Sequence, residues 1–356
     1  MMKKLKKLLV LAMAMMIAVC AYQPLAVRAD SIEDGMTWEE RDAWRAFINQ
    51  PISAGPWNVA EGVTAYVKAG ILYVEGEGAI PDYDRQALAA RPWHYEKFDA
   101  IWIDDGITEI GSNAFWGRNT VYSVRIPSTI FIKDPNCFYG IKADSIVRIS
   151  GNTVATKMIG NIEYTSAMSI INWFQDQKSY RVSVDFNEDA KRLFKTQNYP
   201  YLENVFYCTE HKEVTDNPGY VDIHFKRSTL PICKWTTGQQ DGYSLKCEKY
   251  VPGYYTLLHF SNFIGDYHYG AAFKMWTINP KAQHSNETLT PCTYQLDVPN
   301  GLIYPGRTFK LICVMDSAGT TVVLDDLDAN DATFTFQSDS IPYQCALIYQ
   351  DPVVAQ

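Results

Sequence analysis

The fold is decided by the stretch Ile101–Phe115, which reads IWIDDGITEIGSNAF. Its first three residues recur at steps of 23 residues, as Ile101-Trp102-Ile103, Val124-Arg125-Ile126 and Val147-Arg148-Ile149. In the same register, Ala114-Phe115-Trp116-Gly117 aligns with Cys137-Phe138-Tyr139-Gly140. Several matches at one fixed period predict an array in which each repeat adds one short strand and one turn with a buried Phe. Neighbouring repeats then stack to bury their apolar faces.

This pattern resembles the BspA-like leucine-rich repeats of bacterial surface proteins. The resemblance includes the strand and turn that precede the repeats in that family, here Gly76–Tyr83 (GEGAIPDY) followed by Pro92-Trp93. It covers residues 57–155, less than a third of the chain. The second repeat departs from the pattern, because Lys133 stands where the first repeat has the apolar Ile110. The resemblance implies a leucine-rich-repeat fold, and it says little about the ligand because such families bind many different things.

We therefore predict a mainly β protein: a short leucine-rich-repeat solenoid with an N-terminal helix and hairpin as its cap, then a β-rich, sandwich-like C-terminal region. The hairpin joins Val63–Lys68 to Ile71–Glu75, and the helix begins at Thr37, whose spacing to Glu40 is that of a capping box. The predicted units are a signal peptide (1–29), the cap and solenoid (30–157), a small α+β unit (158–232) and an antiparallel β-sandwich-like domain (233–356).

The second half of the chain has no repeat and is rich in strand signals. A helix is predicted after Asn187, with Ala190, Leu193 and Phe194 on its apolar face, and residues 168–186 fit either a helix or a hairpin. Seven strand-like runs then follow one another between turn residues, which is typical of a sandwich. They are Tyr254–Ser261, Ala271–Ile278, Thr293–Val298, Arg307–Met315, Thr320–Leu324, Ala332–Gln337 and Tyr343–Tyr349.

The N-terminus has the pattern of an export signal. Basic residues at Lys3–Lys7 precede an apolar run from Leu8 to Ala21, and Val27-Arg28-Ala29 offers small residues for cleavage, with Val19-Cys20-Ala21 as an earlier alternative. The signal contains five of the 32 basic residues and no acidic ones, so the remaining 327 residues carry 27 basic and 40 acidic residues, a net charge of −13. We expect a secreted or cell-surface-associated protein with no membrane insertion after cleavage and no nucleic-acid partner, because phosphate backbones bind clustered Lys and Arg.

Seven cysteines follow the signal, so they cannot all pair within one chain. Cys233 and Cys247 flank a turn-rich stretch and are candidates for a hairpin disulfide. Cys313 and Cys345 are expected to face each other in the interior, either as thiols or as a disulfide.

The sequence contains none of the common catalytic motifs. There is no Gly-x-Ser-x-Gly elbow, HExxH, Walker loop or GxGxxG, and no two of the six histidines have the helical i, i+4 spacing of a metal pair. Asp326, Asp328 and Asn330 have oxygen ligands at the first positions of a calcium loop, but the Gly and the final Glu are replaced. An acidic hairpin loop explains them better. The sequence predicts a non-enzyme without a cofactor.

The best candidate for binding is one face of the repeat strands. If the apolar residues of each strand point inward, then Trp102, Arg125 and Arg148 point outward and form a ladder. Exposed aromatic and Arg side chains are common anchors of binding interfaces. We expect an extracellular protein or glycan as the ligand. The alternatives are carbohydrate binding by the C-terminal β domain and a passive structural role in a surface assembly; the oligomeric state is left open.

Overall fold

The computed structural model describes a mainly β protein with several sheets, none of them closed. It describes residues 37–38, 42, 45–47, 49–142, 145–151, 153–175, 180–184, 206–208, 212–213, 221–223, 225–227, 233–237, 244–279, 282–285, 292–315, 321–327, 333–338 and 342–352. The predicted signal peptide and the helix expected after Asn187 lie outside these residues. At the predicted N-terminal helix, the described positions 38, 42 and 45–47 are helical. In the described part of the chain, no helix is long and apolar enough to cross a membrane.

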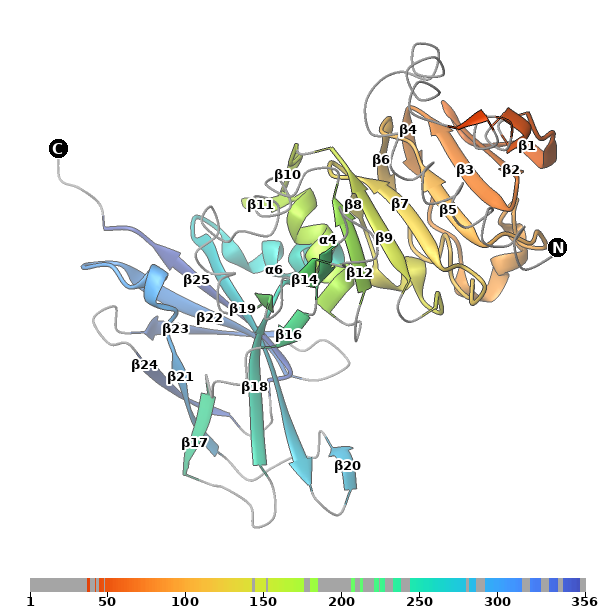
Figure 1. The fold of residues 1–356 in the computed structure, drawn as a ribbon. Helices are drawn as coiled ribbons and strands as arrows, with labels where there is room; N and C mark the ends of the chain where they lie inside the picture. The colour runs from red at the N-terminus through yellow and green to blue at the C-terminus, as the bar shows by residue number, and fades with distance from the viewer. Residues whose placement is uncertain are drawn as a thin grey trace.

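The repeats build the centre of a nine-stranded sheet in the order β1-β2-β3-β5-β7-β9-β12-β15-β14. Its strands are β1 (Ile52–Ala60), β2 (Val63–Lys68), β3 (Ile71–Gly76), β5 (Ala100–Ile103), β7 (Ser123–Pro127), β9 (Ile146–Ser150), β12 (Tyr180–Val184), β14 (Lys212–Glu213) and β15 (Val221–Ile223). Strands β3, β5, β7, β9 and β12 are parallel and lie side by side (Figure 1). Ile101 pairs with Val124 and Val124 with Val147, which confirms the predicted register.

The predicted hairpin is confirmed as β2 and β3, which pair antiparallel. Ala69 and Gly70 at its turn have φ values of 55° and 76°. Two successive residues with positive φ are the backbone of a tight two-residue hairpin turn, whose twist matches that of the strands.

A second, short parallel sheet covers the other side of the repeats. It runs β4-β6-β8 and consists of β4 (Gly78–Ile80), β6 (Ile107–Ile110) and β8 (Phe131–Ile132). The short 3₁₀ helices η1 (Arg85–Ala90) and η2 (Pro135–Phe138) lie in the turns. Apolar side chains of both sheets, such as Ile103 and Ile110, are fully buried in one core.

A column of aromatic rings runs through that core along the direction in which the repeats stack. Trp93 stacks on Phe115, Phe115 on Phe138, and Phe138 on Trp173, with ring centroids 5.6, 5.2 and 4.3 Å apart. Phe115 and Phe138 are 0% and 1% exposed, which confirms that both turns bury their Phe. Trp93 also donates a hydrogen bond from Nε1 to the carbonyl of Ala114.

The last member of the column comes from beyond the repeats. The hairpin of β10 (Thr156–Ile159) and β11 (Ile162–Thr165) leads into helix α4 (Ser166–Gln175), which carries Trp173. Residues 168–175 are thus helical, and β12 follows as a strand that pairs in parallel with β9. Both the sheet and its core therefore continue past the predicted boundary at residue 157. A small separate sheet of β13 (Phe206–Cys208) and β16 (Phe225–Arg227) also falls in the 158–232 unit.

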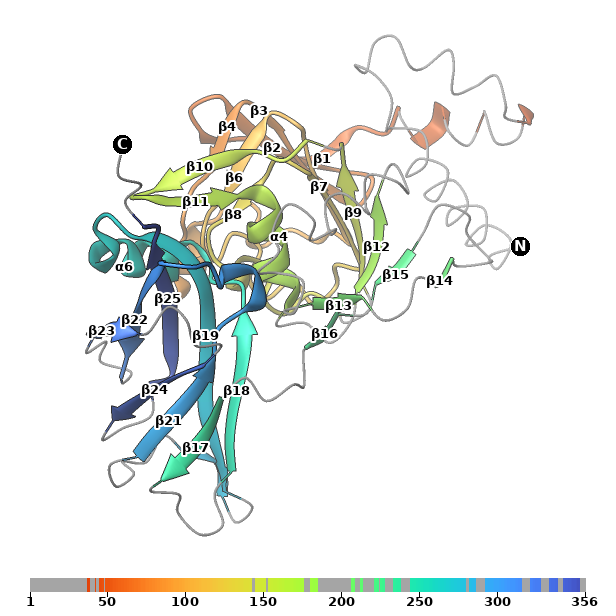
Figure 2. The same ribbon diagram turned by 90° about the vertical axis from the view of Figure 1, so that its left-hand side faces the viewer.

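The C-terminal part has two antiparallel sheets (Figure 2). The first is a six-stranded sheet of β18 (Ser244–Tyr250), β19 (His268–Asn279), β20 (Ala282–Ser285), β22 (Thr308–Val314), β23 (Thr321–Leu327) and β25 (Gln344–Gln350). The second is a three-stranded sheet of β17 (Cys233–Thr237), β21 (Cys292–Asp297) and β24 (Thr333–Ser338). Tyr294, Leu296 and Phe336 of the second share a buried core with Phe273, Leu311 and Leu347 of the first. Six of the seven predicted strands are confirmed.

The seventh prediction is wrong, because Tyr254–Ser261 belongs to helix α6 (Tyr254–Ile264). Leu257, Phe260 and Ile264 have the spacing of one helical face, and all three are buried. Gly265 ends the helix with a φ of +56°. The density of aromatic and apolar residues in this stretch hid the helical period, because both faces of the helix are apolar.

The hairpin expected between Cys233 and Cys247 is not formed. Strand β17 pairs with β21 and β18 pairs with β19, so the two cysteines lie on strands of different sheets rather than on one hairpin. Cys247 is a thiol.

Candidate functional site

The outward face of the nine-stranded sheet carries the predicted ladder, and the ladder is longer than the sequence indicated. Strand register places Tyr66 beside Tyr73, Tyr73 beside Trp102, Trp102 beside Arg125, and Arg125 beside Arg148. Alternation along each strand points the neighbouring residues of these five, such as Ile101 and Ile103, into the core. Three aromatic side chains are therefore followed by two guanidinium groups across five adjacent strands.

The aromatic rings of the ladder stack on one another. The centroids of Tyr66 and Tyr73 are 5.2 Å apart and those of Tyr73 and Trp102 are 5.8 Å apart, with interplanar angles of 17° and 26°. The guanidinium carbon of Arg125 lies 4.8 Å from the ring centroid of Trp102, which confirms the predicted contact. Tyr73 and Trp102 have neighbours on both ring faces and Tyr66 has one on a single face, so these half-buried rings present mainly their edges outward.

The two arginines are less exposed than the sequence led us to expect. Arg125 and Arg148 are only 8% and 7% exposed. Arg125 lies along the sheet instead of extending into solvent, because its Nη1 donates to the carbonyl of Ile103 and its Nη2 pairs with Oδ1 of Asp105 at 3.2 Å. The same carboxylate oxygen accepts a hydrogen bond from Ser150 on β9. The exposed part of the ladder is thus its aromatic half.

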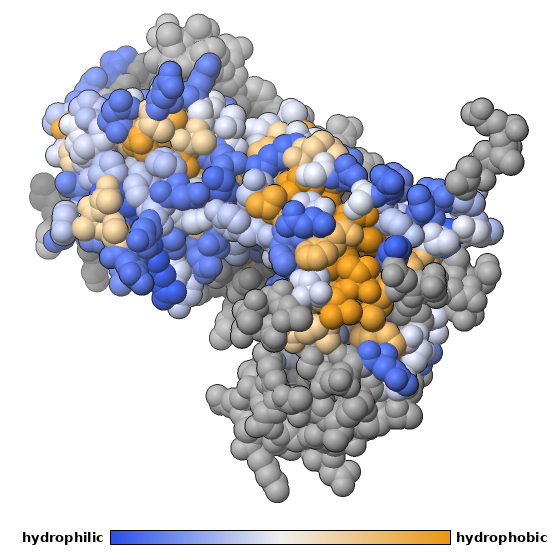
Figure 3. All heavy atoms as spheres, turned by 180° about the vertical axis from the view of Figure 1, so that it is seen from behind, coloured by the Kyte–Doolittle hydropathy of each residue, from blue (hydrophilic) through white to orange (hydrophobic). Residues whose placement is uncertain are grey.

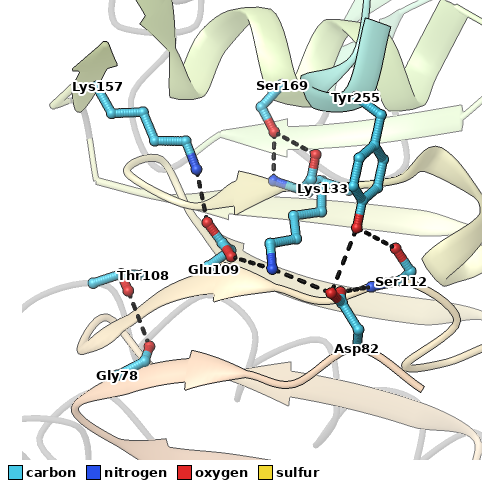
Figure 4. Close-up of polar contacts among 10 residues, drawn as sticks. Gly78, Asp82, Thr108, Glu109, Ser112, Lys133, Lys157, Ser169 and Tyr255 are labelled. Atoms are coloured by element: carbon cyan, nitrogen blue, oxygen red, sulfur yellow. Dashed lines mark hydrogen bonds and ion pairs between the residues drawn. The ribbon is translucent and has the colours of Figure 1, made fainter. Parts of the chain in front are cut away.

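A polar cluster lies on the opposite side of the repeats, where they meet α6 (Figure 4). Asp82 accepts hydrogen bonds from the backbone N–H of Ser112 and from Nζ of Lys133. The hydroxyl of Tyr255 on α6 reaches both Asp82 and Ser112, at 3.5 and 3.3 Å. Glu109 pairs with Lys133 at 3.1 Å and with Lys157 at 2.7 Å. Lys133, the departure from the repeat pattern, therefore links strand β6 to the segment after β4 instead of filling the core.

Lys157 is also enclosed by aromatic rings. Its Nζ lies 4.4 Å from the ring centroid of Phe131, 4.7 Å from that of Tyr254 and 5.9 Å from that of Tyr164. The rings come from β8, α6 and β11, so a single cation contacts the repeats, the hairpin and the helix. Burial raises the pKa of Tyr164 above its usual range. The cluster is suited to fixing the C-terminal part against the repeats.

Two arginines that the sequence did not single out hold the turns of the preceding segment and the first repeat. Arg91 donates from Nη1 to the carbonyls of Asn113, Ala114 and Trp116. Arg118 donates to the carbonyls of Trp93, His94 and Glu96. Burial, and then the charge of Arg91, lowers the pKa of Arg118 to about 10. Both side chains satisfy turn carbonyls and so serve the fold rather than a ligand.

An apolar patch lies over the α6 region on the back of the molecule (Figure 3). Its helix contributes the partly exposed Tyr255, Leu258 and Phe263, and Met158 of the adjacent β10 is 61% exposed. The buried face of the same helix packs on α4 and on the six-stranded sheet in a shared core. Helix α6 is therefore apolar on both sides, which is unusual for a helix at the surface.

The calcium-loop candidate gains no support from the described residues. Asp326 lies in strand β23, and Asp328 and Asn330 fall outside the described part of the chain. No group of three or more His, Cys, Asp or Glu side chains arranged to hold a metal ion occurs among the described residues.

Tyr66 and Tyr73 are the ladder residues that the sequence analysis missed. The signal was present, because alternation in the predicted hairpin puts Tyr66 and Tyr73 on the outward face, beside Trp102. The polar cluster had no such signal, since Asp82, Lys133 and Tyr255 come from segments more than 50 residues apart.

Comparisons with known proteins give one local similarity. No family model matches the chain, and no curated protein matches it. A solved structure of a leucine-rich repeat protein from Eubacterium ventriosum is similar at 28% sequence identity and a TM-score of 0.24. The match covers 27% of this chain and 25% of that one, so this chain spans about a quarter of the length of that protein.

Proposed function

We propose that this chain is an exported bacterial protein, associated with the cell surface, that binds a protein ligand without catalysis. In this proposal the parallel strands and stacked turns are a short leucine-rich-repeat solenoid. The β2–β3 hairpin covers one end of it and α4 the other. The 23-residue register of the strands and the unbroken aromatic column support this reading, since stacked repeats need both ends covered.

The observation that carries the proposed binding role is the ladder of Tyr66, Tyr73 and Trp102 ending on Arg125. Partly exposed Tyr and Trp held rigid by stacking lose little conformational entropy on binding, which suits them as anchors. The pairing of Arg125 with Asp105 and Ile103 holds the end of the aromatic row in place.

Ring orientation favours a protein ligand over a glycan. A sugar stacks on the open face of an aromatic ring, and the ladder rings already stack face to face, with interplanar angles of 17° and 26°. In the C-terminal part, the most exposed aromatic side chain among those whose exposure is described outside α6 is Tyr304, at 56%, in the loop before β22. The guanidinium of Arg307 lies 5.6 Å from its ring centroid and 3.9 Å from that of Tyr349. Among the described side chains, neither region offers a row of coplanar rings with open faces.

The proposal is tested by capturing partners from extracellular extracts on the immobilised chain lacking residues 1–29, with a glycan array as the parallel arm. The double variant Trp102→Ala/Arg125→Ala is expected to lose the captured partner while its circular dichroism stays that of the wild type. Tyr304→Ala is the control, because it removes an exposed aromatic far from the ladder in sequence. Equal capture by the wild type and the double variant, or binding confined to the glycan array, would overturn the proposal.

A further inference from the structure

The two central strands of the C-terminal sheet bring a pair of cysteines together. Cys313 on β22 and Cys345 on β25 are direct partners in the antiparallel register. Their side chains lie on the same face, are 1% and 0% exposed, and have Sγ atoms 3.7 Å apart. Facing residues of an antiparallel pair have Cα atoms about 4.5–5.5 Å apart, which falls inside the range that a disulfide spans.

The described surroundings of the pair are mainly apolar, and no other metal ligand is grouped with it there. Cys345 also lies beside Phe273 of β19, and both cysteines belong to the core between the two sheets. A metal site needs three or more ligands, and none is assembled around this pair in the described part of the chain. Oxidation to a disulfide is the covalent chemistry that remains for two adjacent thiols.

We propose that Cys313 and Cys345 form a disulfide whenever the chain folds in the presence of a disulfide oxidant. For the protein in its natural setting, this rests on the export that is part of the proposed function, because disulfides persist in oxidising compartments. One cysteine thiolate attacks a sulfur of the oxidant's disulfide and expels one oxidant thiolate, leaving a mixed disulfide. The second cysteine thiolate then attacks the protein sulfur of that mixed disulfide and releases the second oxidant thiol. The two cysteines lose two protons and two electrons, and the oxidant is reduced to two thiols.

Burial determines when this exchange occurs. An oxidant reaches the two Sγ atoms only while the core between the sheets is still open, so the bond forms during folding. In the folded protein the same burial shields the bond from reductants. The disulfide ties β22 to β25 covalently and adds to the stability of the folded state by restricting the unfolded chain.

The test refolds the reduced, denatured chain lacking residues 1–29 in a mixture of reduced and oxidised glutathione. The sample is quenched in acid, alkylated in denaturant and digested for mass spectrometry. The expected product is a linked peptide pair containing Cys313 and Cys345. The linkage should resist dithiothreitol in the native protein and yield to it in urea. Cys137, which is fully buried in the repeat core and whose pKa burial raises, is the internal control and should be alkylated throughout.

A variant without the two cysteines tests whether the Cys313–Cys345 disulfide raises the melting temperature. The wild type refolded with glutathione should melt several degrees above the wild type refolded in reductant, and the double variant Cys313→Val/Cys345→Ala should melt at one temperature in both buffers. Full alkylation of Cys313 and Cys345 after oxidative refolding, or linkage of either to another cysteine, would overturn the proposal. The refolding test does not depend on export, so cell fractionation tests the proposed location separately.

Discussion

The ring of Phe115 stacks on the ring of Phe138, 23 residues further along the chain, with the two centroids 5.2 Å apart. Each ring thus covers one face of the other, and their outer faces are covered by Trp93 and Trp173. Four rings contributed by four successive segments form one continuous contact, so loss of an inner ring affects two stacking contacts at once.

Phe115→Ala should therefore lower the free energy of unfolding by about 3–5 kcal/mol, the usual cost of removing a buried Phe. Urea denaturation followed by circular dichroism measures it. Tyr139→Ala, in the turn of the next repeat and 55% exposed, is the control and should cost much less. An unchanged midpoint for Phe115→Ala would contradict the stacked core.

Lys157→Met should destabilise the protein by about 1–2 kcal/mol, because it keeps the apolar stem but removes both the cation over Phe131 and Tyr254 and the ion pair with Glu109. Part of the difference should disappear in concentrated salt, which screens the partly exposed ion pair. Glu163→Gln, an exposed change on the same hairpin, is the matched control. If the wild type and Lys157→Met are equally stable at low salt, the charge of Lys157 does not stabilise this contact.

His94 should titrate below its ordinary pKa of about 6.5. Burial and the charges of Arg91 and Arg118 lower its pKa. Nη2 of Arg91 lies 3.2 Å from Nδ1 of His94 and can only donate, so Nδ1 accepts and the neutral ring carries its proton on Nε2. A lowered folded-state pKa means that the stability contributed by neutral His94 is present above the unfolded pKa and is lost as the pH falls through the folded one.

NMR titration of the His94 ring measures this pKa directly, and unfolding of His94→Gln at pH 7.5 and 5.5 gives the effect on stability. The wild type should lose more stability than His94→Gln between the two pH values, since glutamine takes up no proton. A titration midpoint at or above the ordinary value would show that the neighbouring arginines do not act on this ring.

Phe260→Ala should destabilise the repeats and the C-terminal sheets together. Phe260 is fully buried in a core that joins Met168 and Ile171 of α4 to Ile312 and Ile348 of the six-stranded sheet. Hydrogen exchange of β7 and of β22 should therefore accelerate in parallel. Faster exchange in β22 alone would indicate that the two parts unfold separately.

The repeat part of the fold could be predicted because its period is local and strict. Ile101, Val124 and Val147 are spaced by one repeat and pair in the structure, and the ladder neighbours Trp102 and Arg125 follow from that register. The exposure of the arginines could not be predicted, because the alternation of a strand sets the face of Arg125 and not the path of its long side chain. The contact with the carbonyl of Ile103 decides that path.

Helix α6 and the polar cluster were missed for different reasons. The run from Tyr254 to Ile264 is apolar on both helix faces, so its composition favoured a strand and its helical period was masked. Asp82 and Tyr255 are 173 residues apart, and no local pattern indicates a contact at that separation. Both features are determined by tertiary packing and not by a periodic sequence pattern, so the sequence alone did not predict them.

The Trp residues at the two ends of the aromatic column limit how such a chain can lengthen by duplication. Trp93 lies in the segment before the first repeat. Trp173 lies in α4, which also packs on α6 and on the C-terminal sheet. A unit appended after the last repeat would separate Phe138 from Trp173 and disturb every part attached to α4. A unit of 23 residues inserted between the turns of Phe115 and Phe138 keeps both terminal contacts and places one more ring within the stack. We therefore expect that additional repeats, whether from gene duplication or from engineering, are tolerated between the existing repeats and not at either end of the column.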